Sequence, residues 1–219
     1  MGAYVMELAT LMAIFSLVIV SPGADLAMVL RQSVVHGRRA AIVTSFGLGA
    51  SLLFHISYTI LGLGLIISKS VALFNIVKWC GVAYLVYIGF RALRAGSLTA
   101  ENTSPQERNF APEQGSVPGQ GPIKAFVLGF ATNALNPKPV FFFLSVFANV
   151  VSVHTPAAVR FGYGLVMASC LIVWFVGVSY FMTTPRMRAA FSRASKWIDR
   201  VSGVVFIGLG LKLAAAKAN

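Results

Sequence analysis

Two charged side chains stand inside long apolar stretches of the sequence, where a charge is costly and therefore a candidate for function. Asp25 is predicted to be the only acidic residue deep inside a membrane span. Its carboxylate can bind a substrate ammonium group or exchange a proton; alternatively, it only complements the dipole of the helix that it begins. Lys138 can pair with Asp25 or hold a substrate carboxylate, or its ammonium group can snorkel to the interface.

Neutral polar side chains accompany these charges. Asn133 and Asn136 offer amide donors and acceptors to a zwitterion, although Asn136 can equally serve as a helix cap. His55 can relay protons because histidine titrates near neutral pH. The alternative for His55 is a neutral ring that is hydrogen-bonded to a backbone carbonyl.

The stretch that contains Asp25 is too long for one straight membrane helix. It runs for 33 residues from Tyr4 to His36, about 50 Å at 1.5 Å per residue against a hydrocarbon core about 30 Å thick. It is interrupted by Ser21-Pro22-Gly23, and proline removes an intrahelical hydrogen bond. Ser21 is expected to be the N-cap and Pro22 the first residue of a new helix that begins at about Gly23.

The stretch that contains Lys138 repeats this arrangement. It covers the 31 residues from Ile123 to Val153, and Asn136 followed by Pro137 again predicts a cap and a helix start. Irregular backbone at membrane depth is tolerated where it lines a cavity, and a pair of interrupted helices is the sequence pointer to a transporter's binding site. The alternative is a pair of ordinary proline kinks.

Both interrupted helices are expected to point N–H groups of their second halves into one space, which suits an anion. The expected substrate-binding residues are Ser21, Pro22, Gly23, Asp25, Asn133, Asn136, Pro137 and Lys138. The expected proton-coupling residues are Asp25 and His55.

The composition is that of an integral membrane protein. Hydrophobic residues make up 57% of the 219 residues and charged residues 11%, against about 25% charged in soluble domains. The net charge of +12 is attributed to basic loops beside an anionic leaflet rather than to nucleic-acid binding. No GxSxG, HExxH or P-loop pattern occurs, so neither an enzyme nor an ATPase is predicted, and no cofactor or metal is expected.

The apolar runs predict an all-α, polytopic bundle of about six transmembrane helices. Residues 96–122 are rich in proline and glycine and carry half of the acidic residues, which predicts a flexible linker outside the membrane. The linker separates a three-helix repeat at 1–95 from a second at 123–219. Because each half has an odd number of helices, the repeats are inverted, with the first and fourth helices broken near the midplane.

The distribution of basic residues predicts the orientation. Twelve lysines and arginines fall in the first, third and fifth loops and five on the opposite side. The positive-inside rule therefore places both termini outside the cytoplasm.

Three motifs resemble those of the LysE/RhtB family of amino-acid exporters. They are Ser21-Pro22-Gly23-Ala24-Asp25 with the segment from Arg31 to Ala40, the segment from Lys78 to Arg94, and the segment from Gly129 to Leu144. The family usually has proline where this chain has Ala24, so the first break depends on Pro22 and Gly23.

The resemblance implies a multi-pass protein of the bacterial inner membrane that exports amino acids, driven by an ion gradient. It is closer to the RhtB branch, with neutral substrates such as threonine, homoserine or leucine and protons as the coupling ion. The sequence leaves open whether the chain forms a homo-oligomer. An electron- or metal-handling membrane protein is the alternative, but Cys80 and Cys170 lack the paired spacing that it would need.

Overall fold

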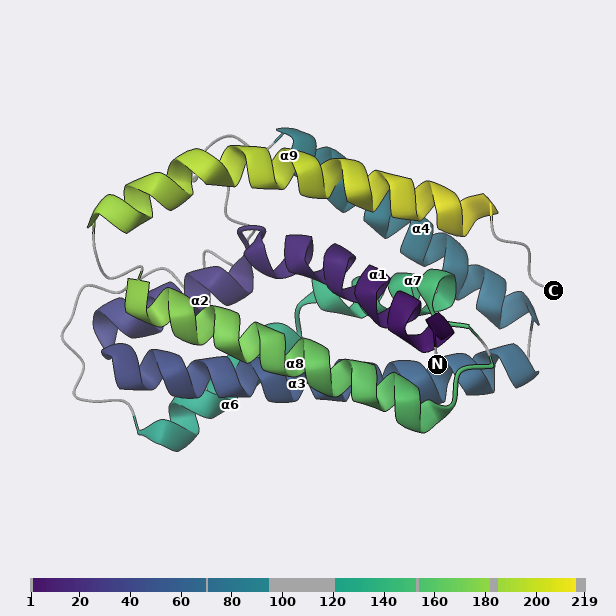
Figure 1. Ribbon diagram of the computed structural model, residues 1–219, viewed down its shortest axis with the longest axis horizontal. Helices are drawn as coiled ribbons and strands as arrows, with labels where there is room; N and C mark the ends of the chain where they lie inside the picture. The colour runs from purple at the N-terminus through teal and green to yellow at the C-terminus, as the bar shows by residue number, and fades with distance from the viewer. Residues whose placement is uncertain (1, 70, 95–120, 153, 182–184, 216–219) are drawn as a thin grey trace.

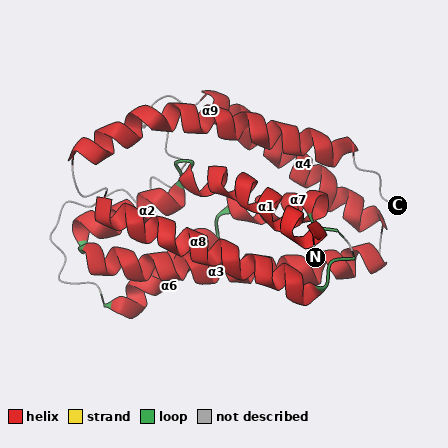
Figure 2. Cartoon of the chain, in the orientation of Figure 1, coloured by secondary structure: helices red, strands yellow, loops and turns green. Residues whose placement is uncertain are grey.

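The protein is described by a computed structural model that covers residues 2–69, 71–94, 121–152, 154–181 and 185–215. Within these ranges the chain consists of helices joined by short loops and has no strand (Figure 1, Figure 2). The prediction of an all-α fold is confirmed for this part of the chain. The helices are α1 (Gly2–Val20), α2 (Ala24–Val35), α3 (Arg38–Lys69), α4 (Val71–Arg94), α6 (Pro122–Ala134), α7 (Pro137–Val150), α8 (Ala157–Phe181) and α9 (Pro185–Ala215).

Both predicted interruptions are present. The first long stretch divides into α1 and α2 at residues 21–23, and the second divides into α6 and α7 at residues 135–136. The predicted linker, 96–122, lies outside the described residues except for Gly121 and Pro122. The division into two three-helix repeats on either side of it stays a prediction.

Three of the described helices are long and apolar enough to cross a membrane on their own. They are α1, the Arg38–Gly62 part of α3, and α8. The other halves of the interrupted helices, α2, α6 and α7, have only 12, 13 and 14 residues. Helices α4 and α9 carry several basic residues. The structure therefore supports a membrane helix bundle, whereas the count of six spans stays a prediction.

The helices form two groups, with α1 and α7 between them. In Figure 1, α4 and α9 run together along one edge, and α3 packs with α8 and α6 along the other. Helices α1 and α7 lie between these groups and contact α9 and each other. The core at this junction is aromatic, with Phe15, Phe142 and Phe143 almost fully buried.

The ends of the helices fall at two opposite ends of the bundle. The turn between α2 and α3, the start of α6 and the start of α9 lie at the left of Figure 1, and the start of α1 and the end of α9 lie at the right. Three of the segments in which basic residues are concentrated thus share one end.

Glycines allow two pairs of helices to approach backbone to backbone. A Cβ on Gly47 of α3 would meet the carbonyl oxygen of Phe126, and a Cβ on Gly129 of α6 would meet that of Thr44. In the other group, a Cβ on Gly203 of α9 would lie 2.7 Å from the carbonyl oxygen of Gly89 in α4. Small residues at such positions are the usual means of close packing between membrane helices.

Candidate functional site

The first interruption leaves the start of α2 open. Gly23 is the N-cap, with extended backbone (φ −177°, ψ −172°), and no side chain caps the helix. The prediction that Ser21 is the N-cap and Pro22 the first helical residue is therefore wrong by two positions. The Ser21 hydroxyl instead donates to a distant carboxylate, described below. The uncapped N–H groups at the start of α2 can accept an anion as partner.

The second interruption is closed by its own residues. Asn136 is the N-cap as predicted, and its Oδ1 accepts a hydrogen bond from the backbone N–H of Lys138 at 3.0 Å. Pro137 and Pro139 have no N–H. The first three residues of α7 therefore have no N–H left for a ligand, and the expectation that both helix starts offer N–H groups holds only for α2. What α7 brings instead is the Lys138 side chain.

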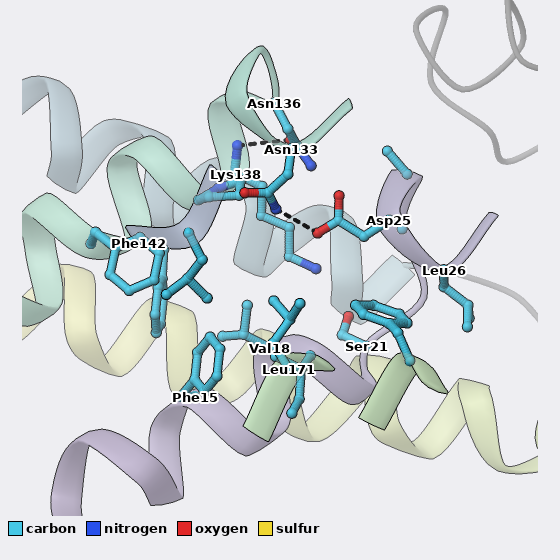
Figure 3. Close-up of a pocket in the computed structure, with 17 residues that line it drawn as sticks. Phe15, Val18, Ser21, Asp25, Leu26, Asn133, Asn136, Lys138, Phe142 and Leu171 are labelled. Carbon is cyan, nitrogen blue, oxygen red and sulfur yellow. Dashed lines mark hydrogen bonds between the residues drawn. The ribbon is translucent and has the colours of Figure 1, made fainter. Parts of the chain in front are cut away.

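A cavity lies between the two interruptions (Figure 3). It leaves about 40 Å³ for the centres of water-sized molecules, room for about three waters, so an amino acid as large as threonine requires it to widen. Its apolar wall includes Phe15, Phe142, Phe143, Leu171 and Phe175. Of the predicted site residues, those that line it are Ser21, Gly23, Asp25, Asn133, Asn136 and Lys138. Pro22, Pro137 and His55 are not among the lining residues.

A hydrogen bond joins the two interruptions directly. Asn133 Nδ2, at the end of α6, donates to Asp25 Oδ2 in the first turn of α2 at 2.7 Å (Figure 3). The Asn133 side chain is 2% exposed, and its Oδ1 accepts no hydrogen bond from any described residue. The pair therefore presents a carboxylate together with an amide oxygen, two acceptors suited to a cation with N–H groups.

His55 of α3 supports this pair from behind the cavity. Its Nε2 lies 3.0 Å from the backbone oxygen of Asn133, and its Nδ1 lies 2.6 Å from the hydroxyl of Tyr58. Because a carbonyl only accepts, Nε2 carries the proton, and a neutral ring then accepts from Tyr58 at Nδ1. The alternative of a histidine bonded to a backbone carbonyl is confirmed. Tyr58 and His55 thus hold the backbone of Asn133, whose side-chain amide donates to Asp25.

Lys138 reaches toward the first interruption from the second. Its side chain extends into the space between Asp25 and Ser21 (Figure 3), and its Nζ lies 3.7 Å from the position that a Cβ on Gly23 would occupy. Nζ also lies 6.0 Å from the centre of the Phe206 ring of α9. The ammonium group thus sits beside the open start of α2 and the cavity, and the role of Lys138 in substrate binding stays a prediction.

A second acidic residue, Asp199, borders the site and was not predicted from the sequence. Asp199 of α9 is 8% exposed, and its Oδ1 accepts a hydrogen bond from Ser21 Oγ at 3.2 Å. Asp25 is therefore not the only acidic side chain beside the site, whereas its being the only one deep inside a membrane span stays a prediction. Asp199 lies between Lys196 and Arg200 in the sequence, which made it resemble a loop residue.

The described residues contain no group of three or more histidine, cysteine, aspartate or glutamate side chains that could hold a metal ion. Cys80 and Cys170 are free cysteines on different helices, α4 and α8. Nothing in the described part of the chain favours the electron- or metal-handling alternative.

Apolar helices with a cavity between two interrupted ones are typical of membrane transporters. The comparison with known proteins agrees: residues 16–217 match the family described as LysE type translocator. The chain belongs to this family, and its predicted resemblance to LysE/RhtB proteins is confirmed. It is a membrane transport protein.

Three curated relatives cover nearly the whole chain. The threonine efflux protein of Escherichia coli (strain K12) is 31% identical over 195 residues, 89% of this chain and 91% of the relative. The homoserine/homoserine lactone efflux protein of Salmonella typhimurium is 26% identical over 205 residues, 92% of this chain and 93% of the relative. The membrane protein YrhP of Bacillus subtilis is 28% identical over 204 residues, 91% and 94% of the two chains. No solved structure matches.

Proposed function

We propose that the protein exports small neutral amino acids from the bacterial cytoplasm across the inner membrane in exchange for protons. The observation that carries this proposal is the contact between the two interrupted helices, where Asp25 and Asn133 face the same cavity as Lys138. The names of the relatives, which specify threonine and homoserine efflux, support the same class of substrate.

The polar groups of the cavity are arranged for a zwitterion. A substrate carboxylate fits between the Lys138 ammonium group and the uncapped start of α2, because both favour negative charge. The substrate ammonium group then faces Asp25 and the unused Oδ1 of Asn133. The remaining wall is aromatic and aliphatic, so the side chain of the substrate meets apolar surface.

The same carboxylate explains an exchange with protons. A charge on Asp25 must be balanced in this poorly hydrated place by Lys138, by a proton or by the substrate ammonium group. A proton and an ammonium group that compete for one carboxylate do not bind together, and this exclusion is the requirement for antiport. His55 holds the backbone oxygen of Asn133, the residue whose side-chain amide donates to Asp25, and this contact supports a positioning role for His55 in this step.

The first expected result concerns the substrate. In cells preloaded with radiolabelled amino acids, the protein should increase efflux of threonine, homoserine and leucine but not of lysine, whose second ammonium group has no further cavity-lining carboxylate to pair with. Threoninamide is the matched control, since it keeps the ammonium group and lacks the carboxylate that Lys138 would hold. Efflux of lysine alone would contradict the proposed substrate class.

A second expected result concerns orientation. We propose that the end of the bundle with the turn between α2 and α3 and the starts of α6 and α9 is cytoplasmic, because basic residues are concentrated in these segments. Protease added to sealed right-side-out vesicles should then leave residues 96–122 intact, whereas inside-out vesicles should be cut there. Cleavage in the right-side-out preparation would show that the orientation is the opposite of the one proposed. Immunoblotting of the fragments distinguishes the two results.

A further inference from the structure

Ser21 is the polar side chain of the cavity that the proposed binding of a zwitterion leaves without a role. Asp25, Asn133 and Lys138 are assigned to the charged groups of the substrate. The side chain of Asn136 caps α7. Ser21 also lines the cavity, and its hydroxyl oxygen lies on the side toward Asp25 and Lys138 in Figure 3. The hydrogen bonds of this hydroxyl group therefore decide what it can bind.

The neighbours of Ser21 fix the direction of its hydroxyl proton. Ser21 Oγ donates to Oδ1 of the buried Asp199 at 3.2 Å. One turn further along α9, Ser202 Oγ donates to the backbone oxygen of Leu17 at 3.3 Å, which holds this face of α9 against the end of α1. None of the described residues donates a hydrogen bond to Ser21 Oγ. Because a hydroxyl group has one proton and two lone pairs, Ser21 can only accept a hydrogen bond from a molecule in the cavity.

We propose that Ser21 determines specificity by accepting a hydrogen bond from a donor on the substrate side chain, such as the hydroxyl group of threonine or homoserine. This proposal rests on the proposed function. Asp199 is a positioning residue, because it takes the Ser21 proton and leaves the oxygen lone pairs to the substrate. Val18 and Ile19, in the last turn of α1, also line the cavity. The methyl group of threonine therefore meets apolar surface beside the hydrogen bond.

The consequence is a modest preference between side chains of equal shape. When an apolar side chain binds, Ser21 keeps its hydrogen bond to Asp199, so the apolar substrate is disfavoured rather than excluded. One neutral hydrogen bond corresponds to about three- to tenfold in affinity. Threonine should therefore bind more tightly than valine, and homoserine more tightly than norvaline, by this factor. Leucine remains a substrate of lower affinity.

The test uses purified full-length protein in proteoliposomes loaded with radiolabelled threonine and one unlabelled competitor. The two members of each pair, threonine and valine or homoserine and norvaline, differ by the exchange of a hydroxyl group for a methyl group. In wild-type protein the hydroxyl member should inhibit labelled efflux at about three- to tenfold lower concentration. In Ser21→Ala, which removes the hydroxyl group of the protein, both members should inhibit equally.

Ser202→Ala is the matched control for a structural effect. It removes the neighbouring hydrogen bond between α9 and α1, and Ser202 does not line the cavity. This variant should keep the wild-type preference for the hydroxyl member of each pair. Loss of the preference in Ser202→Ala as well would show that the packing of α9 against α1, rather than the Ser21 oxygen, determines specificity.

An ether tests the direction of the Ser21 proton. O-Methylhomoserine and norleucine have side chains of nearly equal length, but the ether oxygen of the first can only accept a hydrogen bond. Because Asp199 takes the Ser21 proton, O-methylhomoserine should have no advantage over norleucine. A preference for the ether in wild-type protein but not in Ser21→Ala would show that Ser21 donates to the substrate, and the role of Asp199 would be wrong.

The outcomes separate the two proposals. If wild-type protein exports none of these amino acids, the proposed function is wrong. If wild-type protein exports them but both members of each pair inhibit equally, the role of Ser21 is wrong and the proposed function stands. The same holds if Ser21→Ala keeps the wild-type preference. The comparison in wild-type protein requires no substitution, so its result is decisive whether or not Ser21→Ala folds.

Discussion

Replacement of Asp25 by asparagine should abolish efflux driven by a proton gradient while the protein still inserts and folds. The amide keeps the size of the carboxylate, and its oxygen can still accept the hydrogen bond from Asn133 that joins α2 to α6. The substitution removes the negative charge for which a proton and a substrate ammonium group compete. Hydrogen bonds to charged groups contribute about 1.5–3 kcal/mol, so substrate affinity should also fall by about ten- to a hundredfold.

The measurement combines radiolabelled threonine efflux with the proton flux recorded by a dye in the same vesicles. Glu7→Gln is the matched control, because Glu7 of α1 also accepts hydrogen bonds, from Ser152, Thr155 and Tyr163, but does not line the cavity. That control should keep the wild-type proton-to-threonine ratio. Wild-type efflux in correctly inserted Asp25→Asn would mean that the carboxylate serves only the start of its helix, and the proposed coupling would be wrong.

Combining Asp25→Asn with Lys138→Met separates folding from transport. Removing one member of a group of buried charges leaves the other uncompensated, whereas removing both members is much better tolerated. The double variant should therefore be more stable than Lys138→Met alone and still fail to transport. Recovery of transport in it would show that neither charge binds the substrate.

The two interruptions could be predicted because their cause is local. Proline lacks an N–H wherever the rest of the chain lies, so Pro22 and Pro137 mark the breaks at the level of sequence. Asn136 could likewise be recognised as a cap from its neighbour. The prediction of Ser21 as N-cap was wrong because the N-cap is the residue just before the first helical turn. That turn begins at Ala24, so Gly23 takes this position.

Asp199 could not be predicted from its immediate neighbours, because its burial depends on how α9 packs against the end of α1. The signal that was available is periodicity. Asp199, Ser202, Phe206, Leu209 and Leu213 follow a helical spacing and are all buried. If these five residues are taken as one face of a helix, the predicted last helix begins earlier in the sequence and has an acidic residue on its buried side.

The contact between α3 and α6 holds His55 against Asn133. It has no room for a side chain at Gly129. A Cβ there would meet the backbone of Thr44, including its Cα at 3.1 Å, and a backbone atom cannot rotate away as a side chain can. Gly129→Ala should therefore force the helices apart and destabilise the protein by about 1–3 kcal/mol. Because α3 carries His55 and α6 carries Asn133, the 3.0 Å contact between them should lengthen and transport should fall as well.

Gly177→Ala is the matched control for this prediction. Gly177 lies inside α8, and a Cβ at that position meets no atom within 4 Å. An added methyl group is accommodated there, and alanine favours a helix over glycine, so this variant should melt at or above the wild-type temperature in detergent. If the melting temperature of Gly129→Ala equals that of Gly177→Ala rather than lying well below it, α3 and α6 are not in backbone contact. The link from α3 through His55 to the substrate site would then lose its structural basis.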